Sequence, residues 1–125
     1  MLCGVGIDLF DASRLERELA RGGAHLLGAL FTPGELADCL HGRGSVRALA
    51  LRYAAKEAVA KALALDGAHG MPWRRIEVLG GPRVDAEVRL HGPIAERARE
   101  LGVRHFRLSF SVLRSEVLAT ALAET

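Results

Sequence analysis

The sequence predicts an α+β fold, a single domain in which a mostly antiparallel sheet covers a long buried central helix. Residues 46–65 are rich in alanine and leucine, lack Gly and Pro and are apolar on most sides, which is typical of a helix with several neighbours. Residues 105–112 alternate polar and apolar side chains, which is typical of a half-buried strand. A chain of 125 residues is long enough for one core and too short for two, so we expect residues 1–125 to form one domain.

The N-terminal half supplies one strand and two short helices in this prediction. Residues 2–10 are apolar and predict a buried strand, in which Gly4 and Gly6 let other backbone approach closely. Ser13 is placed to cap a first helix. Residues 32–35, Thr-Pro-Gly-Glu, form a capping box with proline at the first helical position. They predict a second short helix before the long one.

The C-terminal half supplies the rest of the sheet. Residues 75–79 and 83–90 alternate polar and apolar side chains around a Gly-Gly-Pro turn, which predicts a hairpin. Residues 92–101 form an amphipathic pattern that ends at a glycine, which predicts a helix. Residues 105–112 and 116–123, joined by a short turn, predict the closing pair of strands.

Composition and charge argue against several classes of function. The formal net charge of +2 is small, and no basic run is interleaved with aromatic side chains, so we expect no nucleic-acid partner. No apolar run approaches the length of a membrane span, and Asp8 interrupts the apolar start too early for a signal peptide. Cys3 and Cys39 have neither metal-ligand nor disulfide spacing, which is typical of a reducing compartment. We therefore expect a cytoplasmic protein without a membrane partner.

The long helix holds both lysines of the chain, Lys56 and Lys61, whereas the other fifteen basic side chains are arginine. A lone acid, Glu57, lies among its alanines. Glu57 and Lys61 are four residues apart, so an ordinary helix ion pair is one interpretation. Arg52 and Lys56 fall on a different stripe of the helix from Glu57 and Lys61. Because an unpaired buried carboxylate is costly, Glu57 needs a partner or a metal ion.

In this order, the segments resemble the small holo-acyl-carrier-protein synthases, which are single-domain, trimeric phosphopantetheinyl transferases. Residues 6–9, Gly-Ile-Asp-Leu, followed by Arg14, resemble the GxDI…R start of that family. Residues 52–58, Arg-Tyr-Ala-Ala-Lys-Glu-Ala, with Lys61 after them, resemble its RFAxKEAxxKA helix. The strand and turn at residues 76–82 and the closing strand pair resemble those of the family in order and spacing. The resemblance covers nearly the whole chain.

The resemblance implies a metal site and a reaction. In that family, an aspartate at a strand end and a glutamate on the helix hold a magnesium ion on the diphosphate of coenzyme A, which assigns Asp8 and Glu57 as metal ligands. Hard carboxylate oxygens that leave room for water and phosphate oxygens suit Mg²⁺. The implied reaction transfers 4'-phosphopantetheine from coenzyme A to a serine of an acyl carrier protein of fatty acid or polyketide biosynthesis. Its demands are positioning and charge neutralisation at phosphorus.

Further residues take roles by the same resemblance. Lys61 contacts a phosphate in this assignment and forms the catalytic pair with the helix glutamate. Arg52, Lys61 and Pro82 bind coenzyme A, and Arg14 grips the acidic recognition helix of the carrier protein. The family also implies a homotrimer with the nucleotide site between subunits. For Lys56, a catalytic role and a buried stem with its charged head at the surface are both open interpretations.

Five positions depart from the family pattern. Ala64, Leu65 and Asp66 replace the end of a glycine-rich KAFGTG turn, so we expect the helix to run longer and a negative charge to lie near the phosphates. Gly81 replaces the lysine of a GKP turn, and Val112 stands where many members carry a histidine. Two alternatives to a divergent transferase follow. One is a repurposed enzyme that isomerises or cyclises a carrier-tethered intermediate with a carboxylate as general base, and the other is a non-catalytic carrier-binding homologue.

Overall fold

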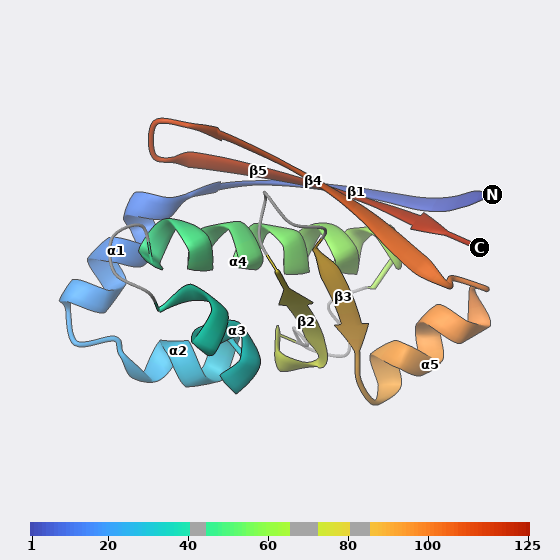
Figure 1. Ribbon diagram of the computed structural model, residues 1–125, viewed down its shortest axis with the longest axis horizontal. Coiled ribbons are helices and arrows are strands. Elements are labelled where there is room, and N and C mark those ends of the chain that lie inside the picture. The colour runs from blue at the N-terminus through green and yellow to red at the C-terminus, as the bar shows by residue number, and fades with distance from the viewer. Residues whose placement is uncertain (41–44, 66–72, 81–85) are drawn as a thin grey trace.

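The computed structural model describes residues 1–40, 45–65, 73–80 and 86–125 of the chain. Its elements in chain order are β1 (Leu2–Asp11), α1 (Ala12–Ala20), α2 (His25–Leu30), α3 (Pro33–Cys39), α4 (Ser45–Ala62), the 3-10 helix η2 (Trp73–Arg75), β2 (Ile76–Leu79), β3 (Glu87–Leu90), α5 (Pro93–Glu100), β4 (His105–Leu113) and β5 (Glu116–Glu124). Figure 1 shows β1, β5 and β4 over one side of α4, with α2, α3, β2 and β3 on the other side. The predicted α+β class is confirmed.

The larger sheet has three strands in the order β1-β5-β4, and both pairings are antiparallel. Ala119 of the central strand pairs with Asp8 of β1 on one side and with Phe110 of β4 on the other. β2 and β3 form a separate antiparallel pair, as expected. β2 begins one residue later than predicted, and residues 83–85 of the second predicted strand lie outside the described residues. The turn between them, including Gly81 and Pro82, lies outside the described residues.

The core lies between the larger sheet and α4, which is buried along most of its length. Small side chains on the inner face of β5 let the helix approach the sheet closely. They are fully buried at Val117, Ala119, Ala121 and Ala123. The prediction of a long, buried central helix is therefore confirmed.

Two glycines bring β1 close to α4. A Cβ atom added at Gly6 would lie 1.8 Å from the carbonyl oxygen of Ala58, and one added at Gly4 would lie 2.1 Å from that of Ala62. Any larger residue would push the strand off the helix, so the predicted close backbone approach is confirmed at both positions. This contact fixes the spacing between the strand that carries one predicted metal ligand and the helix that carries the other.

The start of α1 and the presence of α2 differ from the prediction. β1 continues to Asp11, whose carboxylate accepts a hydrogen bond from the backbone N–H of Ser13 at 2.9 Å and caps α1. The prediction that Ser13 caps this helix is therefore wrong. The capping box of Thr32 and Glu35 is confirmed at the start of α3. The six-residue helix α2 has no side-chain cap, so it lacks the usual signal for a helix start.

The end of α4 contradicts the expected extension of the helix. α4 ends at Ala62, and Ala64 adopts a left-handed conformation with a φ of 52°. The N–H of Leu65 donates to the carbonyl of Ala60 at 3.1 Å, and the N–H of Ala64 donates to that of Lys61 at 3.0 Å. These two bonds form a Schellman C-cap, whose left-handed position favours glycine. The chain thus keeps a tight turn here with alanine in the glycine position.

The outer face of β1 is apolar and exposed, whereas the sequence predicts that this strand is buried. Val5, Ile7 and Leu9 are 49%, 54% and 63% exposed. They alternate along the strand with the residues that face α4, so they lie on the opposite face. A contiguous apolar face of this kind marks an interaction surface. Within the described part of the chain, no helix is long and apolar enough to cross a membrane.

Candidate active site

Asp8, Glu57 and Lys61 lie together where β1 crosses α4. Asp8 lies in β1, and Glu57 and Lys61 lie one turn apart on α4. The Nζ atom of Lys61 donates to the carbonyl oxygen of Ile7 at 2.9 Å and lies 3.3 Å from Oδ1 of Asp8. The side chain of Asp8 is 16% exposed and that of Lys61 is 52% exposed. The structure thus brings together three residues that the sequence predicts for the metal and phosphate site.

Burial raises the pKa of both carboxylates. Burial raises the pKa of Asp8, and a hydrogen bond and the positive charge of Lys61 offset part of this effect. Burial also raises the pKa of Glu57, and the negative charge of Asp8 raises it further, while Lys61 and a hydrogen bond from Tyr53 lower it. Each carboxylate therefore ionises at a cost that the single nearby ammonium only partly offsets.

This pair of carboxylates fits a small divalent cation. A bound cation favours the ionised form of both groups and relieves their repulsion. The described residues contain no group of three or more His, Cys, Asp or Glu side chains that could enclose a metal ion. Two carboxylates suit Mg²⁺, because that ion keeps several waters and takes phosphate oxygens of a substrate as further ligands.

Arg52 is buried on another side of α4. It is 5% exposed, and its Nη1 donates to the carbonyl of Ala48 at 3.2 Å. Its Nε atom is buried and finds no hydrogen-bond partner in the described part of the chain. Burial raises the pKa of the Cys39 thiol on α3 to about 11 overall, although the charge of Arg52 lowers that pKa in part. Among the described residues, no ion pair joins Arg52 to Asp8 or Glu57. An unpaired buried donor is costly, which favours an added acceptor such as a phosphate oxygen.

Lys56 has an environment that the sequence does not predict. Its side chain is 1% exposed, and its Nζ donates to Oε1 of Glu35 at 2.5 Å, to the carbonyl of Leu30 at 2.8 Å and to that of Trp73 at 2.6 Å. The interpretation that its charged head reaches the surface is therefore wrong. The sequence identifies Glu35 only as part of a capping box, and no local pattern links residues 21 positions apart.

An aromatic stack lies beside the carboxylates. The ring centroids of Phe10 and Tyr53 are 4.5 Å apart, and those of Tyr53 and Trp73 are 4.8 Å apart. Phe10 follows Asp8 by two residues on the same face of β1, and Tyr53 precedes Glu57 by one turn of α4. The stack therefore joins β1, α4 and η2 next to the predicted metal ligands.

Arg14 is exposed on α1, the helix that follows β1. Burial raises the pKa of Tyr53, the charges of Glu57 and Asp8 raise it further, and the charge of Arg14 lowers it. Arg14 therefore lies near Tyr53, whose hydroxyl forms a hydrogen bond with Glu57. An exposed cation beside the candidate site can meet an acidic partner as it docks.

The departures from the family pattern are only partly within the described residues. Val112 lies near the end of β4 and is 40% exposed, so this position is accessible but offers no proton acceptor. Leu65 is partly buried at the end of the α4 turn. Asp66, Gly81 and Pro82 lie outside the described residues, and the structure does not test their predicted effects.

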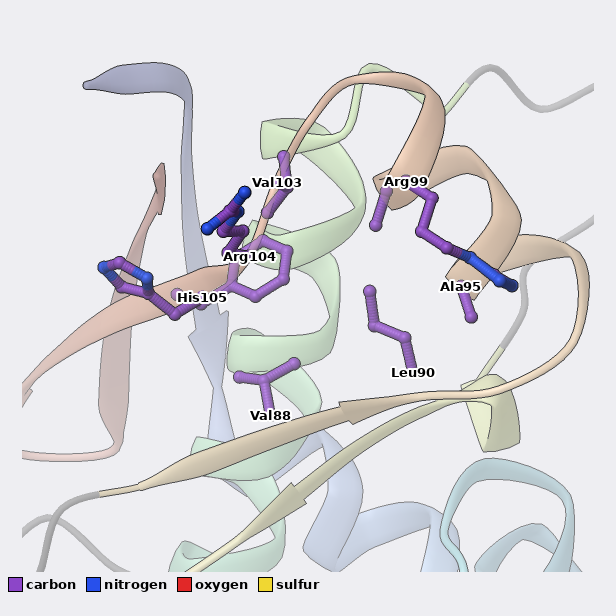
Figure 2. A pocket seen from close by; sticks show the side chains of 9 residues that line it. Val88, Leu90, Ala95, Arg99, Val103, Arg104 and His105 are labelled. Atoms are coloured by element: carbon purple, nitrogen blue, oxygen red, sulfur yellow. The ribbon is translucent and has the colours of Figure 1, made fainter. Parts of the chain in front are cut away.

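A recess of about 230 Å³ lies elsewhere on the surface. Figure 2 shows it between β3, α5 and the start of β4, with Val88 and Leu90 extending from β3. Arg99, one of its lining residues, is paired with Glu96 at 2.6 Å. No predicted site residue lines this recess, so it is separate from the candidate active site.

Comparisons with known proteins agree with the fold and the motifs. The family model of the 4'-phosphopantetheinyl transferase superfamily matches residues 4–121. The holo-[acyl-carrier-protein] synthase of Halorhodospira halophila is 38% identical over 125 residues, which cover 100% of this chain and 99% of that protein. The crystal structure of the synthase (AcpS) from Neisseria meningitidis has a TM-score of 0.86 at 30% identity and covers 100% of both chains. The ACPS-CoA complex of Chronobacterium ammoniagenes has a TM-score of 0.79 at 26% identity, covering 97% of this chain and 96% of that one.

An α+β fold with this motif order, matched over nearly its full length, defines the class as a 4'-phosphopantetheinyl transferase. Within that superfamily the chain belongs to the holo-[acyl-carrier-protein] synthase family, as the resemblance in its sequence implies.

Proposed function

We propose that this protein transfers the 4'-phosphopantetheine group from coenzyme A to a serine of an acyl carrier protein, with Mg²⁺ as its cofactor. The observation that supports this most strongly is the meeting of Asp8, Glu57 and Lys61 at the crossing of β1 and α4. Two carboxylates for a cation and one ammonium for a phosphate suit a diphosphate substrate. The coenzyme A bound to a family member of the same fold is consistent with this substrate.

Each side chain of the site has its own task in the reaction. Asp8 and Glu57 would hold the cation, and the chemistry it would supply is neutralisation of negative charge on the diphosphate. Lys61 is half exposed, so it can exchange its contacts with Ile7 and Asp8 for a phosphate oxygen. Because Val112 offers no proton acceptor, we assign removal of the proton from the carrier serine to water or to the carboxylate of Glu57.

The remaining coenzyme contacts favour a site that is shared between subunits. Arg52 does not meet the carboxylates of its own chain, and its buried Nε lacks an acceptor among the described residues. We propose a homotrimer with the nucleotide site between subunits, in which Arg52 and Pro82 bind coenzyme A. The exposed apolar face of β1, with Val5, Ile7 and Leu9, supplies a surface for the subunit contact.

Arg14 is the proposed contact for the carrier protein. It is exposed on α1 and lies near Tyr53, so an acidic helix that docks on it would present its serine at the site. The two cysteines, Cys3 and Cys39, are both free thiols, which suits a cytoplasmic location.

A mass measurement tests the proposed function. Apo carrier proteins are incubated with the native protein, coenzyme A and Mg²⁺, and the carrier is expected to gain the mass of one phosphopantetheine group. Asp8→Asn should abolish the gain, whereas Glu96→Gln on the exposed side of α5 should leave it unchanged. If the native protein modifies none of a broad panel of apo carriers, the transferase assignment is wrong.

A further inference from the structure

The ion pair between Lys56 and Glu35 is sealed inside the protein. The two side chains are 1% and 0% exposed. Glu35 uses both oxygens, because Oε1 also accepts from the N–H of Thr32 at 2.9 Å and Oε2 accepts from the N–H of Val78 at 3.0 Å. Together with the contacts of Lys56 to two carbonyl groups, these bonds give both charged groups hydrogen-bond partners. The pair thereby holds α3, α4 and β2 together.

Stability alone does not explain such a pair. Removing two charges from water is costly, and well-packed apolar residues in place of a buried ion pair are often neutral or stabilising. A buried pair of this kind can instead fix one geometry among several. The geometry that Lys56 fixes most directly is the main chain at Trp73, whose carbonyl it binds at 2.6 Å.

Trp73 carries this constraint to the aromatic stack. Its ring lies on Tyr53 of α4 at 4.8 Å between centroids, and Tyr53 lies on Phe10 of β1 at 4.5 Å. Because Lys56 holds the carbonyl of Trp73, it also helps to hold the indole of Trp73 on the ring of Tyr53. Lys56 therefore acts on the contact between β1 and α4 without touching either carboxylate itself.

Asp8 lies between two contacts that hold β1 against α4. On one side, Gly6 meets the main chain of Ala58 so closely that no Cβ would fit. On the other side, the ring of Phe10 lies tilted against that of Tyr53, with 4.5 Å between the centroids. The glycine contact fixes one end of this short segment, and the aromatic stack fixes the other. The spacing between Asp8 and its partner carboxylate on α4 is therefore set by both contacts together.

We propose that Lys56 is a positioning residue for the metal-binding pair Asp8 and Glu57, acting through Trp73 and the stack of Tyr53 on Phe10. This inference rests on the proposed function, because it assumes that the two carboxylates hold a divalent cation. Partners outside the ligand set commonly change metal affinity by about 10–100-fold when they are removed. Loss of Lys56 should thus weaken metal binding even where the fold is kept.

The test uses Mn²⁺ as the probe, with binding to the full-length protein followed by electron paramagnetic resonance of the free ion. Lys56→Met alone leaves the carboxylate of Glu35 buried without a counter-charge, so the informative variant is the double change Lys56→Met with Glu35→Leu, which removes both charges. Trp73→Ala is the second variant, since it removes the indole but keeps the ion pair. Both should fold cooperatively and bind Mn²⁺ about 10-fold more weakly than the native protein.

Fluorescence supplies a second readout, because Trp73 is the only tryptophan. The double variant should shift its emission, as the indole is no longer held on Tyr53. Ile94→Ala, a core change on α5, controls for lost stability and should leave Mn²⁺ affinity unchanged. Native affinity in both the double variant and Trp73→Ala overturns the positioning role but not the proposed function. A native protein that binds no Mn²⁺ overturns both.

Discussion

The ammonium of Lys61 lies 3.3 Å from a carboxylate oxygen of Asp8, across the crossing of β1 and α4. This contact lowers the pKa of Asp8, but burial outweighs it and the net shift is upward. Glu57, one turn before Lys61, also has a raised pKa, in part because of the charge on Asp8. The site therefore holds more negative charge than its own cation can balance, which is the property expected of a site for a divalent ion.

Ionisation of these two carboxylates should destabilise the metal-free protein. The pKa values of Asp8 and Glu57 are raised above the ordinary 3.8 and 4.5, so the folded state binds their protons more tightly than the unfolded state. By linkage, their contribution to stability is fully present below the ordinary values and is lost as pH rises through the raised ones. Thermal melts over the pH range in which the two carboxylates ionise should show a smaller loss of stability with rising pH for the double variant Asp8→Asn with Glu57→Gln than for the native protein. An equal loss in both proteins would rule out the raised pKa values.

Removal of either carboxylate should abolish transfer while the fold is kept. Asp8→Ala or Glu57→Ala deletes one of the two proposed metal ligands, and we expect turnover to fall by at least about 10²-fold. In the absence of metal, the melting temperature of Glu57→Ala should equal or exceed that of the native protein, because the variant lacks a half-buried carboxylate with a raised pKa. Rate assays with purified carrier protein and parallel melts measure both effects. Full activity in either variant would remove the metal assignment.

Replacement of Ala64 by glycine should stabilise the protein. Ala64 has a φ of 52°, a conformation that costs an L-residue with a Cβ atom about 1 kcal/mol. Part of the gain is offset because glycine makes the unfolded chain more flexible. We expect a net gain of about 0.5 kcal/mol in urea unfolding. The matched control is Ala62→Gly in the last turn of α4, which should lose stability, and equal effects at both positions would contradict the strain.

A histidine at position 112 should raise the rate of transfer. Val112 is 40% exposed near the end of β4, so an imidazole can be accommodated there. A general base typically contributes about 10²–10⁴-fold, and its absence predicts a low native rate at neutral pH that rises with pH. Val112→His should raise the rate at neutral pH and flatten its rise with pH, provided that coenzyme A binding is unchanged. A native rate that does not depend on pH would contradict this account.

The apolar face of β1 should hold the proposed trimer together. Ile7 is 54% exposed, and a charge there would be buried at the subunit contact. Ile7→Asp should therefore give a monomer in light scattering at micromolar concentration and lose coenzyme A binding at the shared site. Leu101→Asp, at the end of α5, introduces the same charge elsewhere and should leave the trimer intact. A native protein that is already monomeric would contradict both the trimer and the shared site.

The sequence predicts well the features that depend on local pattern. Alanine-rich residues 46–65 predict the long buried helix, and Gly6 predicts the close contact with α4. The resemblance to the family assigns Asp8, Glu57 and Lys61 to one site. The sequence alone does not explain why they meet, because their proximity depends on the packing of β1 on α4.

Other features depend on long-range contacts or on conformations that the residue type disfavours. Lys56 and Glu35 form their pair only because α3 packs on α4, and neither residue signals the other locally. Alanine has the highest helix propensity, so the sequence predicts that the helix continues through Ala64. The structure ends the helix there instead, with Ala64 in a left-handed conformation that alanine rarely adopts. The sequence does not predict the exposure of Ile7, because an apolar strand has the same residue pattern whether it packs in the core of its own chain or against a second subunit.

We propose that Asp8 and Glu57 form a metal-dependent site for coenzyme A. Calorimetry of the native protein with coenzyme A, with and without Mg²⁺, tests it most directly, and circular dichroism of the same sample confirms the fold. We expect coenzyme A to bind measurably and to bind more tightly when Mg²⁺ is present. In Asp8→Asn, the affinity for coenzyme A should no longer depend on Mg²⁺. Complete absence of binding by the well-folded native protein would contradict the proposal.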